Sequence, residues 1–195
     1  DVTGSYILTQ DVTSTGACFE ITTDDVVFDC DDHSITGDGS GYGVYLSFVE
    51  NVTFMNCDVS NFDSGIYLGY SEDNILSGNN VFNNSGDGVY FGSGSDNNTL
   101  SANYVFNNSD DGIYVVGSDG NVLDDNNVCS NVESDFYCVS SIGNSGTGNT
   151  FGSVTACGDG WPTEYNLCEG YCGIGYCSGD DVCFNDMCVP EFNEC

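Results

Sequence analysis

The residues of this chain that are best suited to bind ions or take part in a reaction are carboxylates. They recur once in each repeat of the middle part of the chain. In a stack of strands about 4.8 Å apart, neighbouring carboxylates repel by about 1 kcal/mol in water and by more at a lower effective dielectric constant. Such a row is expected to raise some of its own pKa values or to bind cations. Calcium, a hard ion that takes six to eight oxygen ligands, fits this chemistry; a solvated face of a salt-adapted protein is the alternative. We call the row the acidic ridge, and it consists of Glu50, Glu72, Asp73, Asp96 and Asp119.

A second set of acids lies in the turn on the other side of the central strands, and we expect no catalytic residues there. The chain has 31 Asp and Glu, one His and no Lys or Arg. Paired carboxylates serve glycoside hydrolysis, but these acids form ladders instead of one unusual cluster. The single histidine, His33, falls near Cys30 and Cys57, whose thiols are expected to form disulfides and not a metal site. We predict a non-enzymatic protein that requires no cofactor. The second set is Asp63, Asp87, Asp110, Asp111, Glu133 and Asp135.

A short motif centred on tyrosine positions these acids. It occupies residues 43–46, 65–68, 88–91 and 112–115, with a degenerate copy at 135–138, at intervals of 22, 23, 24 and 23 residues. Because alternate side chains of a strand face opposite sides, the flanking apolar residues point inward and the tyrosines outward. Tyrosine contacts between strands stabilise a sheet, and a contiguous exposed aromatic surface also marks interaction sites. We call the row the tyrosine stripe, and its members are Tyr45, Tyr67, Tyr90, Tyr114 and Tyr137.

Two further apolar segments follow each motif, so each repeat contains three short strands separated by turns rich in Asn, Gly, Ser and Asp. This pattern predicts a parallel β-helix of about six coils. We expect a lead-in or cap at residues 1–15, the solenoid at 16–157 and a Cys-rich module at 158–195. The third strands are centred on Val59, Val81, Val105, Val128 and Val154. Two columns of asparagines are expected to form structural amide ladders: Asn74, Asn98, Asn121 and Asn149, and Asn79, Asn103 and Asn126.

The string from Asp73 to Phe91 resembles the repeats of right-handed parallel β-helix proteins of the NosD and pectin-lyase-like type. The resemblance covers about residues 16–157 and implies an all-β, right-handed parallel β-helix. Such repeats are common in secreted and surface proteins of archaea and bacteria. The superfamily contains lyases, hydrolases, adhesins and structural proteins, so the fold does not select an activity. Its lyases use a Lys or Arg as base beside calcium, and this chain has neither residue.

The net charge of −31 restricts the partners of the chain. Nucleic acid, anionic membranes and polyanionic substrates are excluded, since binding to phosphates and similar groups depends on basic side chains. The even number of 12 cysteines indicates an oxidising compartment and a set of disulfides. We expect all of them to pair: Cys18, Cys30, Cys57, Cys129, Cys138, Cys157, Cys168, Cys172, Cys177, Cys183, Cys188 and Cys195.

Four sequons fit an extracellular surface that carries glycans, at Asn51, Asn83, Asn97 and Asn107. The sequence thus predicts a secreted structural protein that assembles with copies of itself into a filament or surface coat. The alternative is an adhesin or carbohydrate-binding module that uses the tyrosine stripe with calcium. A glycan hydrolase is the third alternative. Partners are accordingly other copies, surface proteins or glycans.

Overall fold

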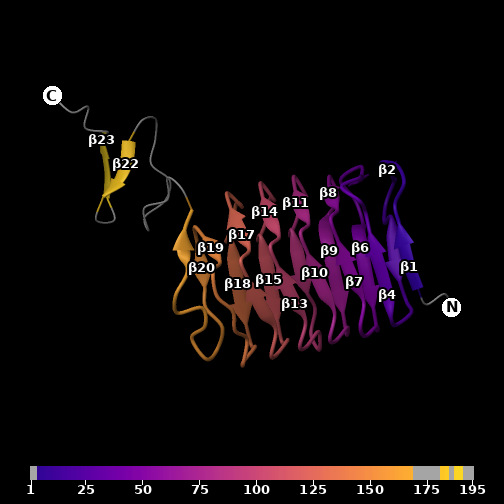
Figure 1. Cartoon of the computed structure of the whole chain (residues 1–195). Helices are drawn as coiled ribbons and strands as arrows, with labels where there is room; N and C mark the ends of the chain where they lie inside the picture. Colours follow the sequence, from indigo (N-terminus) through magenta and orange to yellow (C-terminus); the bar gives the residue numbers. More distant parts are fainter. Residues whose placement is uncertain (1–3, 169–180, 185–186, 191–195) are drawn as a thin grey trace.

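A computed structural model describes residues 4–168, 181–184 and 187–190 of the chain. About six coils stack into a solenoid with parallel sheets along its length (Figure 1). The prediction of an all-β parallel β-helix with three short strands per coil is therefore confirmed. In the part of the chain that the structure describes, no helix is long and apolar enough to cross a membrane.

Three sheets form the walls of the solenoid, and successive strands of one coil enter successive sheets. The first sheet contains β1 (Gly4–Ile7), β4 (Val26–Asp29), β7 (Thr53–Met55), β10 (Ile75–Ser77), β13 (Thr99–Ser101) and β16 (Val122–Asp124). The second contains β2 (Val12–Thr13), β5 (Ser34–Thr36), β8 (Asp58–Ser60), β11 (Asn80–Phe82), β14 (Tyr104–Phe106), β17 (Asn127–Cys129), β19 (Thr150–Phe151) and β21 (Asn166–Leu167). The third, which we call the tyrosine sheet, contains β3 (Phe19–Ile21), β6 (Tyr42–Ser47), β9 (Ser64–Gly69), β12 (Val89–Phe91), β15 (Ile113–Val116), β18 (Phe136–Val139) and β20 (Val154–Thr155).

The core follows from the alternation within each strand. In β6, Val44 and Leu46 are fully buried, while the intervening Tyr45 is half-buried on the outer face. The same pattern holds in β9, where Ile66 and Leu68 flank the half-buried Tyr67. Burial of one such aliphatic side chain contributes about 1.5–3 kcal/mol. The column of buried side chains inside the three walls therefore holds the coils together.

Buried asparagines hold successive coils in register. Asn79 Nδ2 donates to Asn103 Oδ1 at 3.0 Å, and Asn103 Nδ2 donates to Asn126 Oδ1 at 2.9 Å. Each amide also donates to a backbone carbonyl of the preceding coil, as Asn103 does to Leu76 at 2.9 Å. Since buried polar groups without partners are costly, these ladders fix the turn geometry of every coil. A third ladder, which the sequence reading did not identify, consists of Asn84, Asn108 and Asn131.

Exposed asparagines occupy the neighbouring turn positions for a different reason. Asn51, Asn83, Asn97 and Asn107 have φ values of 58°, 56°, 55° and 55°, in the left-handed region. Asparagine tolerates this region better than most residues because its short polar side chain bonds locally. The four predicted sequons thus coincide with exposed left-handed turns. Their glycosylation remains a prediction.

The final coil differs from the predicted register. We expected residues 149–151 in a second strand and Val154 in a third, but β19 pairs with β17 and β20 pairs with β18. Asn149 therefore extends the ladder of Asn126, at 3.0 Å, and not that of Asn121. The ladder of Asn121 continues to Asn144 through a 2.8 Å bond from the Asn121 N–H.

Strands continue past both predicted limits of the solenoid. In the segment expected to be a lead-in, β1 pairs with β4 and β2 pairs with β5, so these residues already belong to the walls. At the other end, β21 pairs with β19 beyond residue 157. In the segment expected to be a Cys-rich module, β22 (Asp181–Phe184) and β23 (Met187–Pro190) form an antiparallel pair.

Candidate functional site

The tyrosine sheet carries a continuous aromatic row on its outer face. Successive ring centroids of the tyrosine stripe are 5.1, 4.8, 5.0 and 5.2 Å apart from Tyr45 to Tyr137. Tyr42, which the sequence reading did not include, joins the row with its ring centroid 4.8 Å from that of Tyr67. All six rings are half-buried. The structure therefore places the five predicted tyrosines in one uninterrupted surface and adds a sixth.

Two glycines make room for the rings. A Cβ on Gly69 would lie 2.9 Å from the hydroxyl oxygen of Tyr45, and one on Gly92 would lie 3.0 Å from that of Tyr67. Neither glycine has a positive φ, so backbone conformation does not require glycine there. The glycines instead allow each phenol to extend along the solenoid over the next coil.

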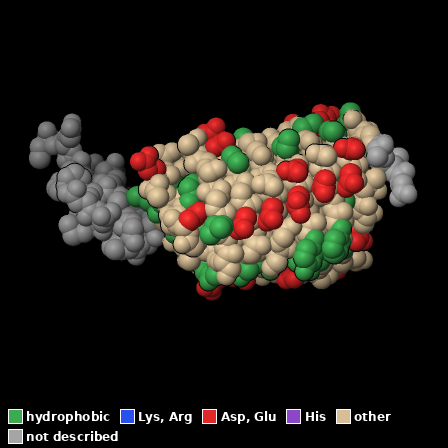
Figure 2. All heavy atoms as spheres, turned by 90° about the horizontal axis from the view of Figure 1, so that it is seen from below, with side chains coloured by type: hydrophobic (Ala, Val, Ile, Leu, Met, Phe, Trp, Pro, Cys, Tyr) green, Lys and Arg blue, Asp and Glu red, His purple; other side chains and the backbone are tan. Residues whose placement is uncertain are grey.

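The acidic ridge runs along the solenoid as a row of red side chains (Figure 2). Two of its carboxylates accept hydrogen bonds from backbone N–H groups in the turn of the next coil. Asp96 Oδ1 accepts a 2.7 Å hydrogen bond from the N–H of Asp119, and Asp119 Oδ1 accepts one of 2.8 Å from the N–H of Ile142. Glu50 and Glu72 are paired through a parallel bridge. These contacts give Asp96 and Asp119 a structural role, and calcium binding at the ridge stays a prediction.

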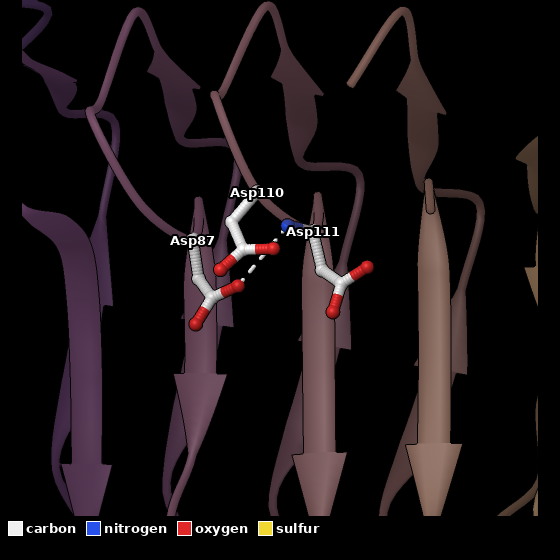
Figure 3. A group of neighbouring side chains, drawn as sticks. All are labelled: Asp87, Asp110 and Asp111. Carbon is white, nitrogen blue, oxygen red and sulfur yellow. Dashed lines mark hydrogen bonds between the residues drawn. The ribbon is translucent and has the colours of Figure 1, made fainter. Parts of the chain in front are cut away.

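Three acids of the second set come together at the opposite end of the tyrosine strands. Asp87, Asp110 and Asp111 each place a carboxylate oxygen within 4.8 Å of the others (Figure 3). Asp87 Oδ1 accepts a 3.1 Å hydrogen bond from the N–H of Asp111, which lies one coil further on. We call these residues the aspartate triad. Asp135, by contrast, accepts hydrogen bonds from the Asn131 side chain and the Gly152 N–H, at 2.9 Å each.

The aspartate triad borders the tyrosine stripe. The pairing of Val89 with Ile113 places Asp87 and Asp111 in one row, next to the row of Tyr90 and Tyr114. Burial, and after it the charges of Asp110 and Asp111, raise the pKa of Asp87 to about 7. Burial also raises the pKa of Asp111 to about 6. The pKa of Tyr90 is raised as well, by burial and then by the charge of Asp87.

The described cysteines form three disulfides. Cys30 pairs with Cys57, Cys138 with Cys157, and Cys129 with Cys168. The prediction that Cys18 is paired differs from the structure, in which its thiol is free and partly buried. Cys168 pairs with the solenoid and not within the predicted Cys-rich module. The side chains of Cys172, Cys177, Cys183, Cys188 and Cys195 lie outside the described residues.

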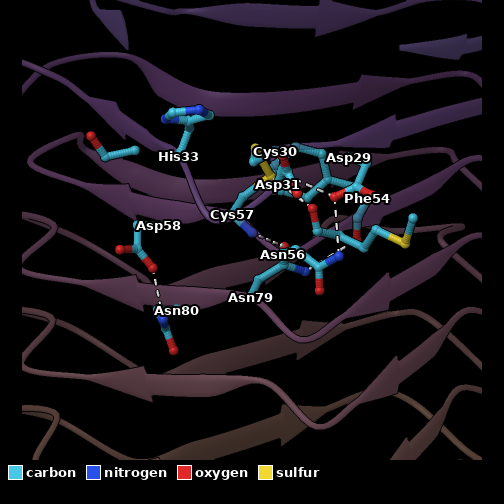
Figure 4. Close-up of a disulfide and its surroundings, with 12 residues drawn as sticks. Asp29, Cys30, Asp31, His33, Phe54, Asn56, Cys57, Asp58, Asn79 and Asn80 are labelled. Carbon is cyan, nitrogen blue, oxygen red and sulfur yellow. Dashed lines mark hydrogen bonds between the residues drawn. A yellow bond between two sulfur atoms is a disulfide. The ribbon is translucent and has the colours of Figure 1, made fainter. Parts of the chain in front are cut away.

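His33 takes no part in a metal site with the nearby cysteines. The sulfur atoms of Cys30 and Cys57 are bonded to each other, and His33 lies to one side of them (Figure 4). Its Nδ1 is 3.1 Å from Asp11 Oδ1, in an ion pair when the imidazole is protonated. Asn56 Nδ2 donates to Asp29 Oδ1 at 3.0 Å beside the disulfide. The disulfide and this hydrogen bond join two successive coils, so their role is structural.

Comparison with known proteins identifies the family of the chain. Residues 6–166 match the family described as "Periplasmic copper-binding protein (NosD)", and the chain belongs to that family. No curated protein matches the chain significantly. Among solved structures, the alginate lyase from Paenibacillus sp. str. FPU-7 is similar, with a TM-score of 0.54 and 15% sequence identity over 75% of this chain and 68% of that one. At this identity the similarity to the lyase concerns the fold alone.

Proposed function

We propose that this member of the NosD family is a non-catalytic, extracytoplasmic binding protein whose tyrosine stripe holds a neutral glycan chain. The observation that carries the proposal is the unbroken row of six half-buried tyrosine rings on one sheet. The description of the family as periplasmic and the three disulfides support a location outside the cytoplasm.

The chemistry of the stripe suits a carbohydrate. Each tyrosine presents an apolar ring beside a hydroxyl, and this combination contacts both the C–H faces and the hydroxyl groups of a sugar. The row extends along the solenoid, so successive sugar units would meet successive tyrosines. Gly69 and Gly92 leave the tyrosine rings free to extend along the sheet, where a glycan chain could contact them. A Cβ at either position would come too close to a phenol oxygen.

The charge of the protein selects among glycans. With a net charge of −31 and no Lys or Arg, the chain repels uronic acid polymers over its whole surface. Acidic side chains border the stripe directly, at Asp87 and Asp111. We therefore propose a neutral polysaccharide and not alginate as the ligand of this chain.

Copper, which the family description names, does not fit the donor atoms of the described residues. Copper sites use imidazole, thiolate or thioether ligands. His33 is the single histidine and lies beside Asp11. The thiols of Cys30 and Cys57 are joined in a disulfide. Among residues 4–168, the one group of three or more potential ligands that lies close together is the all-carboxylate aspartate triad. We derive no function from copper.

Affinity electrophoresis in gels that contain neutral polysaccharides tests the proposal. The native chain is expected to be retarded, and the double variant Tyr67→Ser/Tyr90→Ser is expected to migrate as in a gel without glycan. The matched control is Phe82→Ser/Phe106→Ser, which removes a stacked aromatic pair of the second sheet with ring centroids 5.0 Å apart. Equal retardation of both variants would refute the role of the stripe. Release of reducing ends during incubation would contradict the non-catalytic assignment.

Self-assembly is a second candidate, favoured by the N-terminal end of the tyrosine sheet. β3 pairs with β6 on one side, and its other edge has no strand partner among the described residues. An apolar recess beside this edge is lined by Tyr6, Phe19, Ile21, Val26 and Phe28. Open strand edges invite pairing with another chain. Electron microscopy of the purified protein tests this candidate: fibres support it, and a monodisperse monomer at high concentration contradicts it.

A further inference from the structure

The aspartate triad combines three negative charges with a geometry that fits one ion. Its carboxylate oxygens all lie within 4.8 Å of one another (Figure 3). Oxygen ligands of calcium lie about 2.3–2.6 Å from the ion, so two ligands of one ion are at most about 4.6–5.2 Å apart. Each pair of the three oxygens lies within the range that one ion spans.

An independent observation is the unpaired oxygen of Asp111. This side chain is 7% exposed, and its buried Oδ1 has no hydrogen-bond partner. Leaving a buried acceptor without a donor is unfavourable, and more so when the acceptor carries charge. Asp87 is 9% exposed and directs one oxygen to the N–H of Asp111. Ser134 hydrogen-bonds to the Asp111 carboxylate, but its buried Oδ1 is left without a donor.

No Lys or Arg side chain is available to compensate this charge. The one histidine of the chain is paired with Asp11. A bound divalent cation would compensate this negative charge.

We propose that Asp87, Asp110 and Asp111 bind a hard divalent cation of the calcium type at the edge of the tyrosine sheet. Carboxylate oxygens are the ligands that calcium prefers, and water completes a coordination shell of six to eight. Soft or imidazole-seeking metals lack their usual donors here. The site differs from the acidic ridge, in which Asp96 and Asp119 cap backbone N–H groups. The proposal stands independently of glycan binding by the tyrosine stripe.

Terbium luminescence on the full chain tests the site. Tb³⁺ replaces Ca²⁺ in oxygen-rich sites, and the neighbouring Tyr90 and Tyr114 can transfer excitation energy to it. We expect saturable luminescence excited through tyrosine, one tight site by titration, and displacement by CaCl₂. Asp110→Asn, at an exposed position, and Asp111→Asn are each expected to weaken binding by about tenfold or more, since affinity follows the charge of the ligand set. Calorimetric titration with CaCl₂ alone measures the same change without terbium.

The matched control is Glu164→Gln, which removes one charge at an exposed position outside both the acidic ridge and the aspartate triad. It is expected to bind Tb³⁺ and Ca²⁺ as the native chain does. The proposal is overturned if Asp110→Asn binds as tightly as the native chain, or if Glu164→Gln weakens binding equally. The proposal also fails if the native chain shows no saturable tyrosine-excited luminescence. Should Asp111→Asn not fold, the exposed Asp110→Asn variant still decides the outcome.

Discussion

The rings of Tyr67 and Tyr90 lie almost parallel, at 23°, with their centroids 4.8 Å apart. They come from β9 and β12, which pair directly with these two residues opposite each other. Strand pairing, and not a loop, therefore sets the spacing of the aromatic surface. A surface fixed in this way changes little on binding, so substitutions can alter the stability of the fold and recognition by the stripe independently.

Substitution Gly92→Ala should impair glycan binding while leaving the fold nearly intact. The new Cβ would lie 3.0 Å from the hydroxyl oxygen of Tyr67 and 3.1 Å from the backbone carbonyl oxygen of Leu68, so the phenol must move and the backbone must shift slightly. Because the phenol can rotate, the stability loss should stay near the lower end of the about 1–3 kcal/mol that overpacking costs. Affinity electrophoresis and urea denaturation measure the two effects. The control Gly158→Ala, with ordinary contact distances, should change neither. Unaltered binding by Gly92→Ala would contradict the prediction.

Removal of one buried amide should destabilise the whole solenoid. Asn103→Ala removes donors to Leu76 and Asn126, and it leaves the N–H of Asn79 without its 3.0 Å acceptor. Unsatisfied buried groups cost about 1–3 kcal/mol each, so a loss of about 3 kcal/mol or more is expected. Asn80→Ala, which removes an exposed 2.7 Å bond to Asp58, should cost less than about 1 kcal/mol. Urea denaturation of both variants provides the comparison, and equal losses would rule out the ladder as the cause.

Stability should fall as the pH rises from about 4 to about 7 in the presence of a chelator. The folded-state pKa of Asp87, about 7, exceeds the ordinary value of 3.8 because of burial, so the folded chain binds more protons in this range. The contribution of the protonated carboxyl is complete below pH 4 and is lost above pH 7. Asp87→Asn keeps an oxygen for the N–H of Asp111, at 3.1 Å in the native chain, and should flatten the slope.

General self-repulsion at a net charge of −31 produces a slope of the same sign, so a control with equal charge is needed. Glu72→Gln removes one charge from the acidic ridge and should retain the native slope. Urea denaturation at pH 4.5, 6 and 8 compares the three proteins. If Asp87→Asn and Glu72→Gln have identical slopes, burial of Asp87 does not determine the pH dependence.

Opening the disulfide between Cys30 and Cys57 should weaken the N-terminal coils. The two residues are 27 positions apart, and the entropy of a loop of this size corresponds to about 3–4 kcal/mol at 25 °C. The variant Cys30→Ala/Cys57→Ala should lower the thermal midpoint by several degrees or more. Calorimetry measures this change, with Cys18→Ala as the control because its thiol is already free. A midpoint equal to that of the native chain would exclude a stabilising role.

Much of the fold could be predicted because each repeat carries the same strand pattern and the same buried turn residues. Each tyrosine motif supplies an alternating strand, and each buried asparagine such as Asn98 or Asn103 recurs at the same distance from it. The final coil was misassigned because Gly146 occupies the position where other coils have Leu or Phe. No side chain fits there, since a Cβ on Gly146 would overlap the carbonyl of Leu123. The pattern of an asparagine followed by an apolar residue then reappears at Asn149, one strand later.

The sites were harder to predict than the coils. The tyrosine stripe could be identified from the sequence because its members recur with the same period as the core residues. Tyr42 lies three residues before Tyr45 and does not recur with that period, and its ring contacts that of Tyr67 in the next coil. Likewise, a column of acids gives no indication of which members are buried. Burial of Asp87 and Asp111 depends on the turn geometry of adjacent coils, and only the three-dimensional structure shows Asp111 Oδ1 without a partner.

The positions of the three disulfides determine how such a stack can come apart. A linear array ordinarily frays from its ends, because a terminal coil has a neighbour on one side only. Here Cys30–Cys57 fastens coils near one end, and Cys138–Cys157 and Cys129–Cys168 fasten those near the other. The strands β1 to β3 precede Cys30 and can still peel away, but between the disulfides peeling is blocked, so rupture there has to begin in the interior, where each coil has neighbours on both sides. Under pulling force or attack by proteases, the first strands should therefore detach early, and the part between the disulfides should resist up to a threshold and then fail all at once.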